Sequence, residues 1–240
     1  MAQVRVNGLF VLESSTKDKH TTTPTKMSTS TQAEGEGSSD LLQVVKRART
    51  AARILAAAPS STKNAALANI GARLRDARAA VVAANEEDVE EAEREAKEKE
   101  SREGKPDKSL RALLKRLRLP EKKVSSLLTG LSEVEASDDP VGIVTRAVAL
   151  DDRAGQGPLD LYRVTCPIGV LCVIFEARPD AAVQIASLAI KSGNALLLKG
   201  GREARRTNAA LVELVRAALG DAGLPRDCVQ LVETREQVAA

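Results

Sequence analysis

The sequence predicts an α/β fold in which a helical region and a β-hairpin precede the first, incomplete part of a parallel sheet. Two apolar strand patterns, at residues 168–175 and 195–198, flank a helix pattern that begins at Pro179. Continuous apolar runs are typical of parallel strands buried on both faces, and a strand, helix and strand in succession form a right-handed βαβ unit. Upstream, β-branched segments around a glycine-rich turn indicate a hairpin over residues 140–165.

Residues 1–39 are predicted to be a disordered tail. The stretch from residue 13 to 40 is rich in Ser and Thr, with Gly and Glu, and cannot bury enough apolar surface to order itself. An untargeted extension is favoured over a plastid or mitochondrial targeting segment, because acidic residues such as Glu13 and Asp18 argue against the latter.

Residues 40–139 are predicted to be helical. A first helix runs from a cap at Asp40 to Ala58. A second carries one apolar stripe and continues into the acidic run at residues 85–91. The stripe consists of Leu67, Ile70, Leu74, Ala77 and Val81. For the acidic run, a solvated helix face with pairs such as Glu93–Lys97 is favoured over an acidic binding surface.

A basic amphipathic segment follows at residues 109–119, and packing of its leucines is favoured over membrane or nucleic-acid contact. The helical region ends at Asp138-Asp139-Pro140. The hairpin then places strands at residues 141–150 and 159–165, with the turn between them.

Residues 166–240 are predicted to be the first half of a dinucleotide-binding domain. Pro179 suits the first position of a helix and Asp180 suits the positive end of its dipole. The apolar side of this helix consists of Val183, Ile185, Leu188, Ala189 and Ile190. A helix over residues 203–219 follows and is ended by Gly220 and Gly223. A third strand at 228–232 and a helix start at 234–240 come after it. Three parallel strands leave an open edge, which predicts part of a larger fold.

Composition argues against several kinds of partner. The formal charge of +3 is small and spread out, and aromatic residues that could stack on bases are almost absent, so no nucleic-acid partner is expected. No apolar run is long enough to span a bilayer. Cys166, Cys172 and Cys228 have no metal-site spacing and are expected to be reduced and buried in an intracellular protein, while His20 is expected to be solvated.

The first candidate site is the turn after the second strand, which consists of Lys199, Gly200, Gly201, Arg202 and Glu203. Ligands of parallel sheets bind at the carboxyl ends of the strands. Two glycines allow a ligand to approach the backbone, and the two cations suit ribose hydroxyls or a phosphate. A tight turn with solvated cations explains the same pattern.

The second candidate site is the loop after the first strand, which contains Glu176 and Arg178. An arginine at a strand end can hold a carboxylate or a phosphate through two parallel hydrogen bonds. A local ion pair between Glu176 and Arg178 is the alternative.

The segment CPIGVLCVIFEARPDAAVQIASLAIKSGNALLLKGGREARRTN, residues 166–208, closely resembles the γ-glutamyl phosphate reductases, or glutamate-5-semialdehyde dehydrogenases, of the aldehyde dehydrogenase superfamily. It is most similar to the reductase half of plant-type pyrroline-5-carboxylate synthases. The resemblance implies an aldehyde-dehydrogenase-like fold with a Rossmann-type sheet, and NADP(H)-dependent reduction of γ-glutamyl phosphate to glutamate 5-semialdehyde in proline biosynthesis.

The resemblance also implies roles for individual residues. Lys199 matches a ribose-contacting lysine, and Arg202 stands where it would suit the 2′-phosphate of NADP(H). Glu176 and Arg178 match the loop beneath the nicotinamide and the substrate. The hairpin matches one that bridges subunits, so a homo-oligomer is expected, and the compartment is expected to be the cytoplasm, with a plastid or mitochondrion as alternatives.

None of the three cysteines aligns with the nucleophilic cysteine of the family, which lies in a catalytic domain further along the chain. We therefore expect no catalytic residue within residues 1–240 and no turnover by this chain alone. The alternative is a catalytically inactive module of the same fold that binds nucleotide or associates with a partner.

Overall fold

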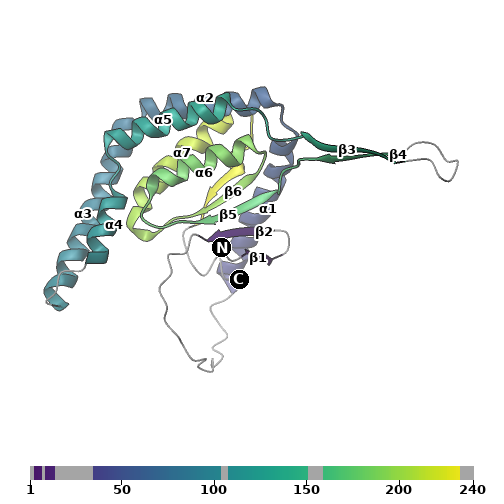
Figure 1. The fold of residues 1–240 in the computed structure, drawn as a ribbon. Coiled ribbons are helices and arrows are strands. Elements are labelled where there is room, and N and C mark those ends of the chain that lie inside the picture. Colours follow the sequence, from purple (N-terminus) through teal and green to yellow (C-terminus); the bar gives the residue numbers. More distant parts are fainter. Residues whose placement is uncertain (1–2, 7–8, 14–34, 104–107, 151–158, 233–240) are drawn as a thin grey trace.

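The computed structural model describes residues 3–6, 9–13, 35–103, 108–150 and 159–232. Two short strands come first, followed by five helices, a hairpin and then alternating strands and helices (Figure 1). The helices are α1 (Gly35–Ala57), α2 (Ser60–Asp76), α3 (Arg78–Glu103), α4 (Lys108–Leu117), α5 (Glu121–Ala136), α6 (Pro179–Lys191) and α7 (Arg205–Asp221), with short 3₁₀ helices η1 (Arg202–Ala204) and η2 (Arg226–Cys228). The strands are β1 (Gln3–Val6), β2 (Leu9–Glu13), β3 (Val144–Leu150), β4 (Leu159–Val164), β5 (Val170–Ile174), β6 (Ala195–Lys199) and β7 (Val229–Leu231).

The main sheet has the strand order β1-β2-β5-β6-β7. Strands β5, β6 and β7 are parallel neighbours, which confirms the predicted βαβ unit and its third strand. Helix α6 begins with Pro179 at its first position and carries Asp180 in its first turn, as predicted. It ends before Gly193, whose φ of 72° is one that glycine adopts without strain.

The prediction of a wholly disordered tail is wrong for its first residues, because β1 and β2 lie there. Strand β2 pairs parallel with β5, so the β5 edge that was expected to be open has a neighbour. The Ser/Thr-rich composition concealed two short segments, QVRV and LFVLE, that have the β-branched and apolar content of strands. Residues 14–34, the hairpin turn at 151–158 and the expected helix start at 234–240 lie outside the described residues.

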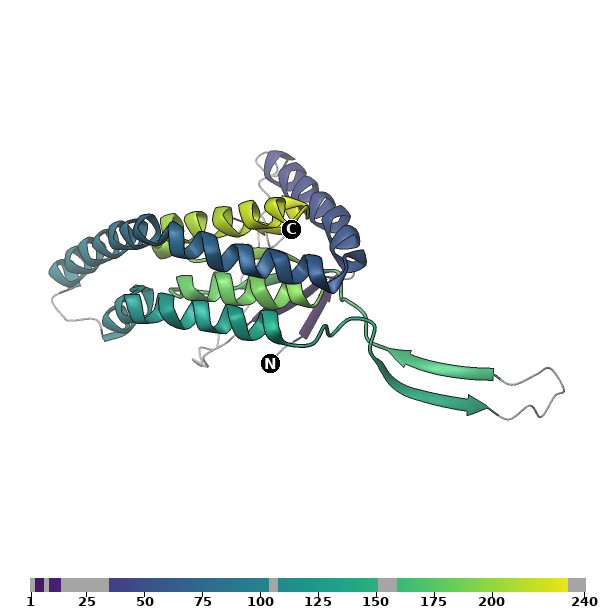
Figure 2. The ribbon, with the colours of Figure 1, turned by 90° about the horizontal axis from the view of Figure 1, so that it is seen from above.

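The two faces of the sheet pack against different helices. Leu171, Val173, Leu196 and Leu198 face the main core, which α2, α5, α6 and α7 complete. These four helices lie side by side in Figure 2. Cys172 and Leu197, on the alternate positions, pack against α1 instead. All of β6 is buried, as predicted, whereas β5 is buried only in part, because Leu171, Val173 and Ile174 keep some exposure.

The second predicted helix is in fact two helices, since the chain breaks at Ala77 between α2 and α3. Neither Gly nor Pro stands at this break, and the apolar spacing continues across it. The sequence pattern therefore predicted a single helix. Conversely, α7 continues through Gly220 to Asp221, although this glycine was expected to end it. Both differences concern where a helix ends, which tertiary packing can shift against weak local preferences.

The acidic run is only partly a solvated face. Asn85 and Asp88 are buried against α7 and the end of α4, while Glu93 pairs with Arg118 instead of with Lys97. Leu188, predicted on the apolar side of α6, is 59% exposed. The predicted hairpin is confirmed as the antiparallel pair β3–β4, and it extends away from the sheet (Figures 1 and 2).

Two buried lysines connect the helical region to the later elements. Lys63 of α2 forms an ion pair with Asp139, at 2.5 Å, just before the hairpin. Lys191, at the end of α6, donates to Asn64 Oδ1 at 2.8 Å and to the Glu135 carbonyl at 2.9 Å. Each of these lysines is at most 3% exposed. A charge buried to this extent destabilises the fold unless it has hydrogen-bond or ion-pair partners.

Candidate functional site

The two predicted loops lie next to each other at one edge of the sheet. Lys199 at the end of β6 pairs with Ile174 at the end of β5, and the Phe175 amide donates to the Lys199 carbonyl at 3.0 Å. Because β5 and β6 are parallel, both polar loops leave the sheet on the same side. The structure thus brings together residues 199–203 and residues 176–178, which are called the cofactor turn and the substrate loop after their predicted roles.

Lys199 is only 8% exposed, although its side chain follows a strand end. Its Nζ donates to the carbonyl of Gly200 at 2.7 Å, and the part of the chain that is described gives it no carboxylate partner. An ammonium group held this way keeps donor capacity for a hydroxyl or phosphate oxygen.

The two glycines have a different surrounding from the one that the sequence suggested. A Cβ on Gly200 would collide with the side-chain amide of Asn208, and a Cβ on Gly201 would collide with the carboxylate of Glu203. The space beside each glycine is therefore filled by a side chain of this protein. A larger residue at either position would displace that side chain, whether or not a ligand also approaches the backbone there.

Glu203 connects the two loops. The amide of Ala177 donates to Oε1 of Glu203 at 2.6 Å. Ala177 has a φ of 50°, in the left-handed region that non-glycine residues seldom occupy. Sequence reasoning identified Glu203 as part of the turn but did not identify this contact, since nothing in the pattern pairs residues 177 and 203.

Arg178 and Arg202 are both exposed, and the described residues supply neither with a carboxylate partner. The alternative of a local ion pair between Glu176 and Arg178 is therefore not found in the structure. Unpaired guanidinium groups at the carboxyl edge of a parallel sheet are free to bind anionic ligands.

Helix α7 starts directly after the cofactor turn and depends on a residue that the sequence analysis did not single out. Asp88 of α3 accepts hydrogen bonds from the Arg206 amide at 3.2 Å and from the Thr207 amide at 2.8 Å. Asn85 donates to the Leu117 carbonyl and accepts from the Leu119 amide. These contacts hold α3, α4 and α7 together behind the candidate site. Asp88 stands among acidic residues that are exposed to solvent, so the sequence alone does not indicate that its side chain is buried.

The cysteines do not form a nucleophilic site. Burial raises the pKa of the Cys228 thiol to about 12, with Asp227 adding to the effect, and burial also raises the pKa of Cys172. Such thiols carry almost no thiolate at neutral pH. Cys166 is exposed, so the expectation that all three are buried is wrong for this residue, which precedes β5 on a loop.

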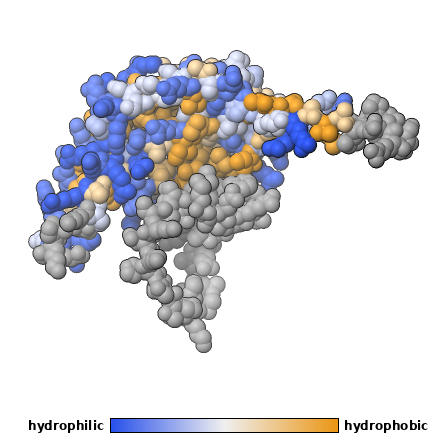
Figure 3. Space-filling model, in the orientation of Figure 1, coloured by the Kyte–Doolittle hydropathy of each residue, from blue (hydrophilic) through white to orange (hydrophobic). Residues whose placement is uncertain are grey.

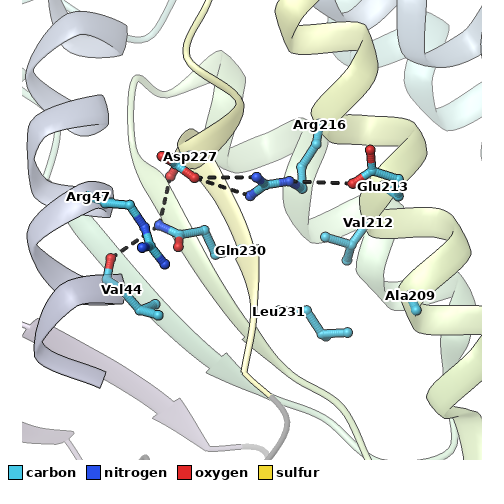
Figure 4. Close-up of a pocket in the computed structure, with 9 residues that line it drawn as sticks. All are labelled: Val44, Arg47, Ala209, Val212, Glu213, Arg216, Asp227, Gln230 and Leu231. Atoms are coloured by element: carbon cyan, nitrogen blue, oxygen red, sulfur yellow. Dashed lines mark hydrogen bonds and ion pairs between the residues drawn. The ribbon is translucent and has the colours of Figure 1, made fainter. Parts of the chain in front are cut away.

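A hollow of about 570 Å³ lies elsewhere, between α1, α7 and β7 (Figure 4). Several of its polar groups already bind one another or the backbone. Arg216 contacts Asp227 at 3.4 Å and the Val229 carbonyl at 2.9 Å, and Gln230 donates to the Val44 carbonyl at 3.2 Å. The hollow contains none of the predicted site residues, so the candidate site remains the loop pair.

Within the described ranges, no helix is both long and apolar enough to cross a membrane. The same part of the chain holds no cluster of three or more His, Cys, Asp or Glu side chains suited to a metal ion.

No model of a known protein family matches the chain. It is 43% identical over 199 residues to the gamma-glutamyl phosphate reductase of Pelotomaculum thermopropionicum, which covers 83% of this chain and 42% of that protein. The probable gamma-glutamyl phosphate reductase of Schizosaccharomyces pombe is 44% identical over 196 residues, covering 81% of this chain and 41% of that protein. The chain thus spans about two-fifths of the length of these relatives.

The structure is similar to that of gamma-glutamyl phosphate reductase from Saccharomyces cerevisiae, with a TM-score of 0.69 and 37% identity over 81% of this chain and 46% of that one. A probable aldehyde dehydrogenase from Listeria monocytogenes, at 14% identity, shares the fold with a TM-score of 0.59 over 85% of this chain and 39% of the other. These likenesses confirm the predicted aldehyde-dehydrogenase-like fold. Over the part of its relatives that it spans, the chain is homologous to the gamma-glutamyl phosphate reductases.

Proposed function

We propose that this chain forms the cofactor-binding part of an NADP(H)-dependent reductase that converts γ-glutamyl phosphate to glutamate 5-semialdehyde in proline biosynthesis. The observation that supports the proposal most is the loop pair, in which Lys199, Arg202 and Arg178 follow two neighbouring strands at the carboxyl edge of a parallel sheet, and none of the three has a carboxylate partner among the described residues. The curated relatives that carry the reductase name support the same reaction.

Each cation has a separate task in this proposal. Lys199 donates to a ribose hydroxyl, and Arg202 binds the 2′-phosphate that distinguishes NADP(H) from NAD(H). Arg178 binds an anionic group of the substrate across the neighbouring strand end. The nicotinamide supplies the hydride, while these residues bind and orient the two ligands. Gly200 and Gly201 contribute by keeping the turn tight around Asn208 and Glu203.

The hairpin is the proposed oligomer contact. Its two strands expose large apolar side chains, and Figure 3 shows this apolar surface where the hairpin leaves the body. These side chains are Ile143, Val144, Leu161, Tyr162 and Val164. Exposed apolar clusters of this kind favour burial against another protein surface, which supports a homo-oligomer. The cytoplasmic compartment stays a prediction.

We expect Arg202→Ala to weaken the binding of NADP⁺ by about tenfold and to leave the binding of NAD⁺ unchanged, because only NADP⁺ carries the 2′-phosphate. Lys199→Ala should weaken both nucleotides alike, since both contain the ribose. Isothermal titration calorimetry of the chain and its variants measures the four dissociation constants. Arg205→Ala, an exposed arginine three residues further on, is the matched control. Equal losses for Arg202→Ala and Arg205→Ala would reject the 2′-phosphate assignment.

The alternative of an inactive association module predicts the same absence of turnover as our assignment of no catalytic residue to this chain. We expect the chain alone to show no oxidation of NADPH in the presence of γ-glutamyl phosphate, because Cys172 and Cys228 are buried thiols and Cys166 does not align with the nucleophilic cysteine of the family. Absorbance at the NADPH band follows the reaction. Measurable turnover by the purified chain would contradict both the module and our assignment of no catalytic residue to it.

A further inference from the structure

A single hydrogen bond ties the cofactor turn to the substrate loop. It runs from the amide of Ala177 to Oε1 of Glu203, over 2.6 Å. Among the described residues, Ala177 is the only non-glycine residue with a positive φ, at 50°. An alanine holds this conformation against its own preference only when the surrounding structure fixes it.

The position of Glu203 is itself fixed. It lies in the 3₁₀ turn η1 between β6 and α7, and its carboxylate occupies the space where Gly201 lacks a side chain. At the other end of the contact, Ala177 is 1% exposed. Because Ala177 is buried and the Glu203 carboxylate fills the space beside Gly201, the contact is suited to hold one backbone conformation.

Arg178 depends directly on that conformation. It follows Ala177, has a φ of −137° and a ψ of 74°, and stands immediately before the first residue of α6. Its guanidinium is exposed, with no ion pair inside the described structure to set its direction. The backbone at residue 177 therefore sets where the Arg178 side chain leaves the chain.

We propose that Glu203 is a positioning residue for substrate binding, because its carboxylate keeps Ala177 in the left-handed conformation that presents Arg178 to an oxyanion of the substrate. The proposal rests on the proposed function for its substrate class, an acyl phosphate. It gives Glu203 a task that is separate from any contact with the cofactor. Gly201 takes part by leaving room for the carboxylate.

The test uses the whole chain, with acetyl phosphate as a small acyl phosphate probe and nuclear magnetic resonance as the readout. In the unaltered chain, the Ala177 amide proton should resonate far downfield and exchange slowly, and the probe should shift the Arg178 Nε–H signal. Glu203→Ala should abolish the first property and weaken probe binding about tenfold. Glu203→Gln, which keeps an acceptor oxygen, should retain part of both.

Rescue separates positioning from general damage. In the double variant Ala177→Gly with Glu203→Ala, glycine adopts the positive φ without help, so most of the probe affinity should return. A merely structural role for Glu203 predicts no rescue. Circular dichroism melting curves check that every variant is folded.

The outcomes distinguish this inference from the function on which it rests. Unchanged probe affinity in Glu203→Ala, or a double variant as weak as Glu203→Ala, would overturn the positioning role. If the unaltered chain and Arg178→Ala gave the same response to acetyl phosphate, the substrate assignment of Arg178 would fail, and the positioning role with it. Binding of NADP⁺ would remain a separate measurement of the cofactor turn.

Discussion

Asp88→Ala is expected to lower the free energy of unfolding by about 3 kcal/mol, because it removes the acceptor for the first turn of α7. Asp88 is buried, and its Oδ2 accepts from the Thr207 amide at 2.8 Å and from the Thr207 hydroxyl at 2.7 Å. The residue that precedes the helix, Ala204, has no side chain that could cap it. An acid from α3 thus takes the place of the cap that the helix itself lacks, and the variant leaves buried donors without partners.

Urea denaturation followed by circular dichroism measures this loss. Asp88→Asn keeps an acceptor oxygen but not the charge, so it should destabilise the chain less than Asp88→Ala. Glu90→Ala is the matched control, since Glu90 lies on the same helix with an exposed side chain and should change stability by no more than about 0.5 kcal/mol. Similar midpoints for Asp88→Ala and Glu90→Ala would contradict the capping role.

The second large effect concerns the ion pair between Lys63 and Asp139. Asp139→Ala should lower the free energy of unfolding by about 3 kcal/mol, because it leaves the ammonium group of Lys63 buried without its counter-charge. Lys63 is 1% exposed, and its Nζ lies 2.5 Å from Asp139 Oδ2. Asp139 also accepts a hydrogen bond from the Val141 amide at 3.0 Å. The variant therefore also weakens the connection between the helical region and the hairpin.

The same pair gives stability a pH dependence of known sign. Burial works to raise the pKa of the Asp139 carboxyl, but hydrogen bonds from Lys63 and from the Val141 amide outweigh burial and hold this pKa below its ordinary value. A carboxyl whose pKa is lower in the folded state contributes stability at neutral pH. That contribution is lost as the pH falls from the unfolded-state pKa through the folded-state pKa. Melting temperatures of the unaltered chain should therefore fall more steeply in acid than those of Asp139→Ala.

A double variant shows whether the pair or the buried charge is responsible. Lys63→Met with Asp139→Ala removes both charges, and it should be more stable than Asp139→Ala alone, since no uncompensated cation remains. Asp138→Ala, which changes the exposed neighbouring acid, is the control for the loop sequence. If Asp138→Ala and Asp139→Ala melted together, the ion pair would not be the cause.

Much of the later half of the fold was predictable because its signals are local. The apolar runs that became β5 and β6, the proline that begins α6 and the glycine-rich segment between β3 and β4 each act within a few residues. The pairing of neighbouring loops was also predictable, since parallel strands place their carboxyl ends on one edge. For this reason the cofactor turn and the substrate loop lie where the sequence indicated.

Other features have no local signal. The break at Ala77, the burial of Asp88 within an acidic run and the exposure of Leu188 all depend on which helix packs against which. Strands β1 and β2 were hidden because the composition of the tail was judged as a whole, whereas two short segments in it pair at the sheet edge. Periodicity identifies which residues share a face, but it does not identify the partner of that face.

The sequence by itself determined the βαβ unit, the hairpin, the family resemblance and the position of the candidate residues 199–203 and 176–178. Only the tertiary structure decided what these residues contact. It showed that Gly201 makes room for Glu203, that Glu203 holds Ala177 and that no described residue forms an ion pair with Arg178. The physical reason is distance along the chain: residues 177 and 203 belong to separate loops, and they meet only because β5 and β6 pair in parallel.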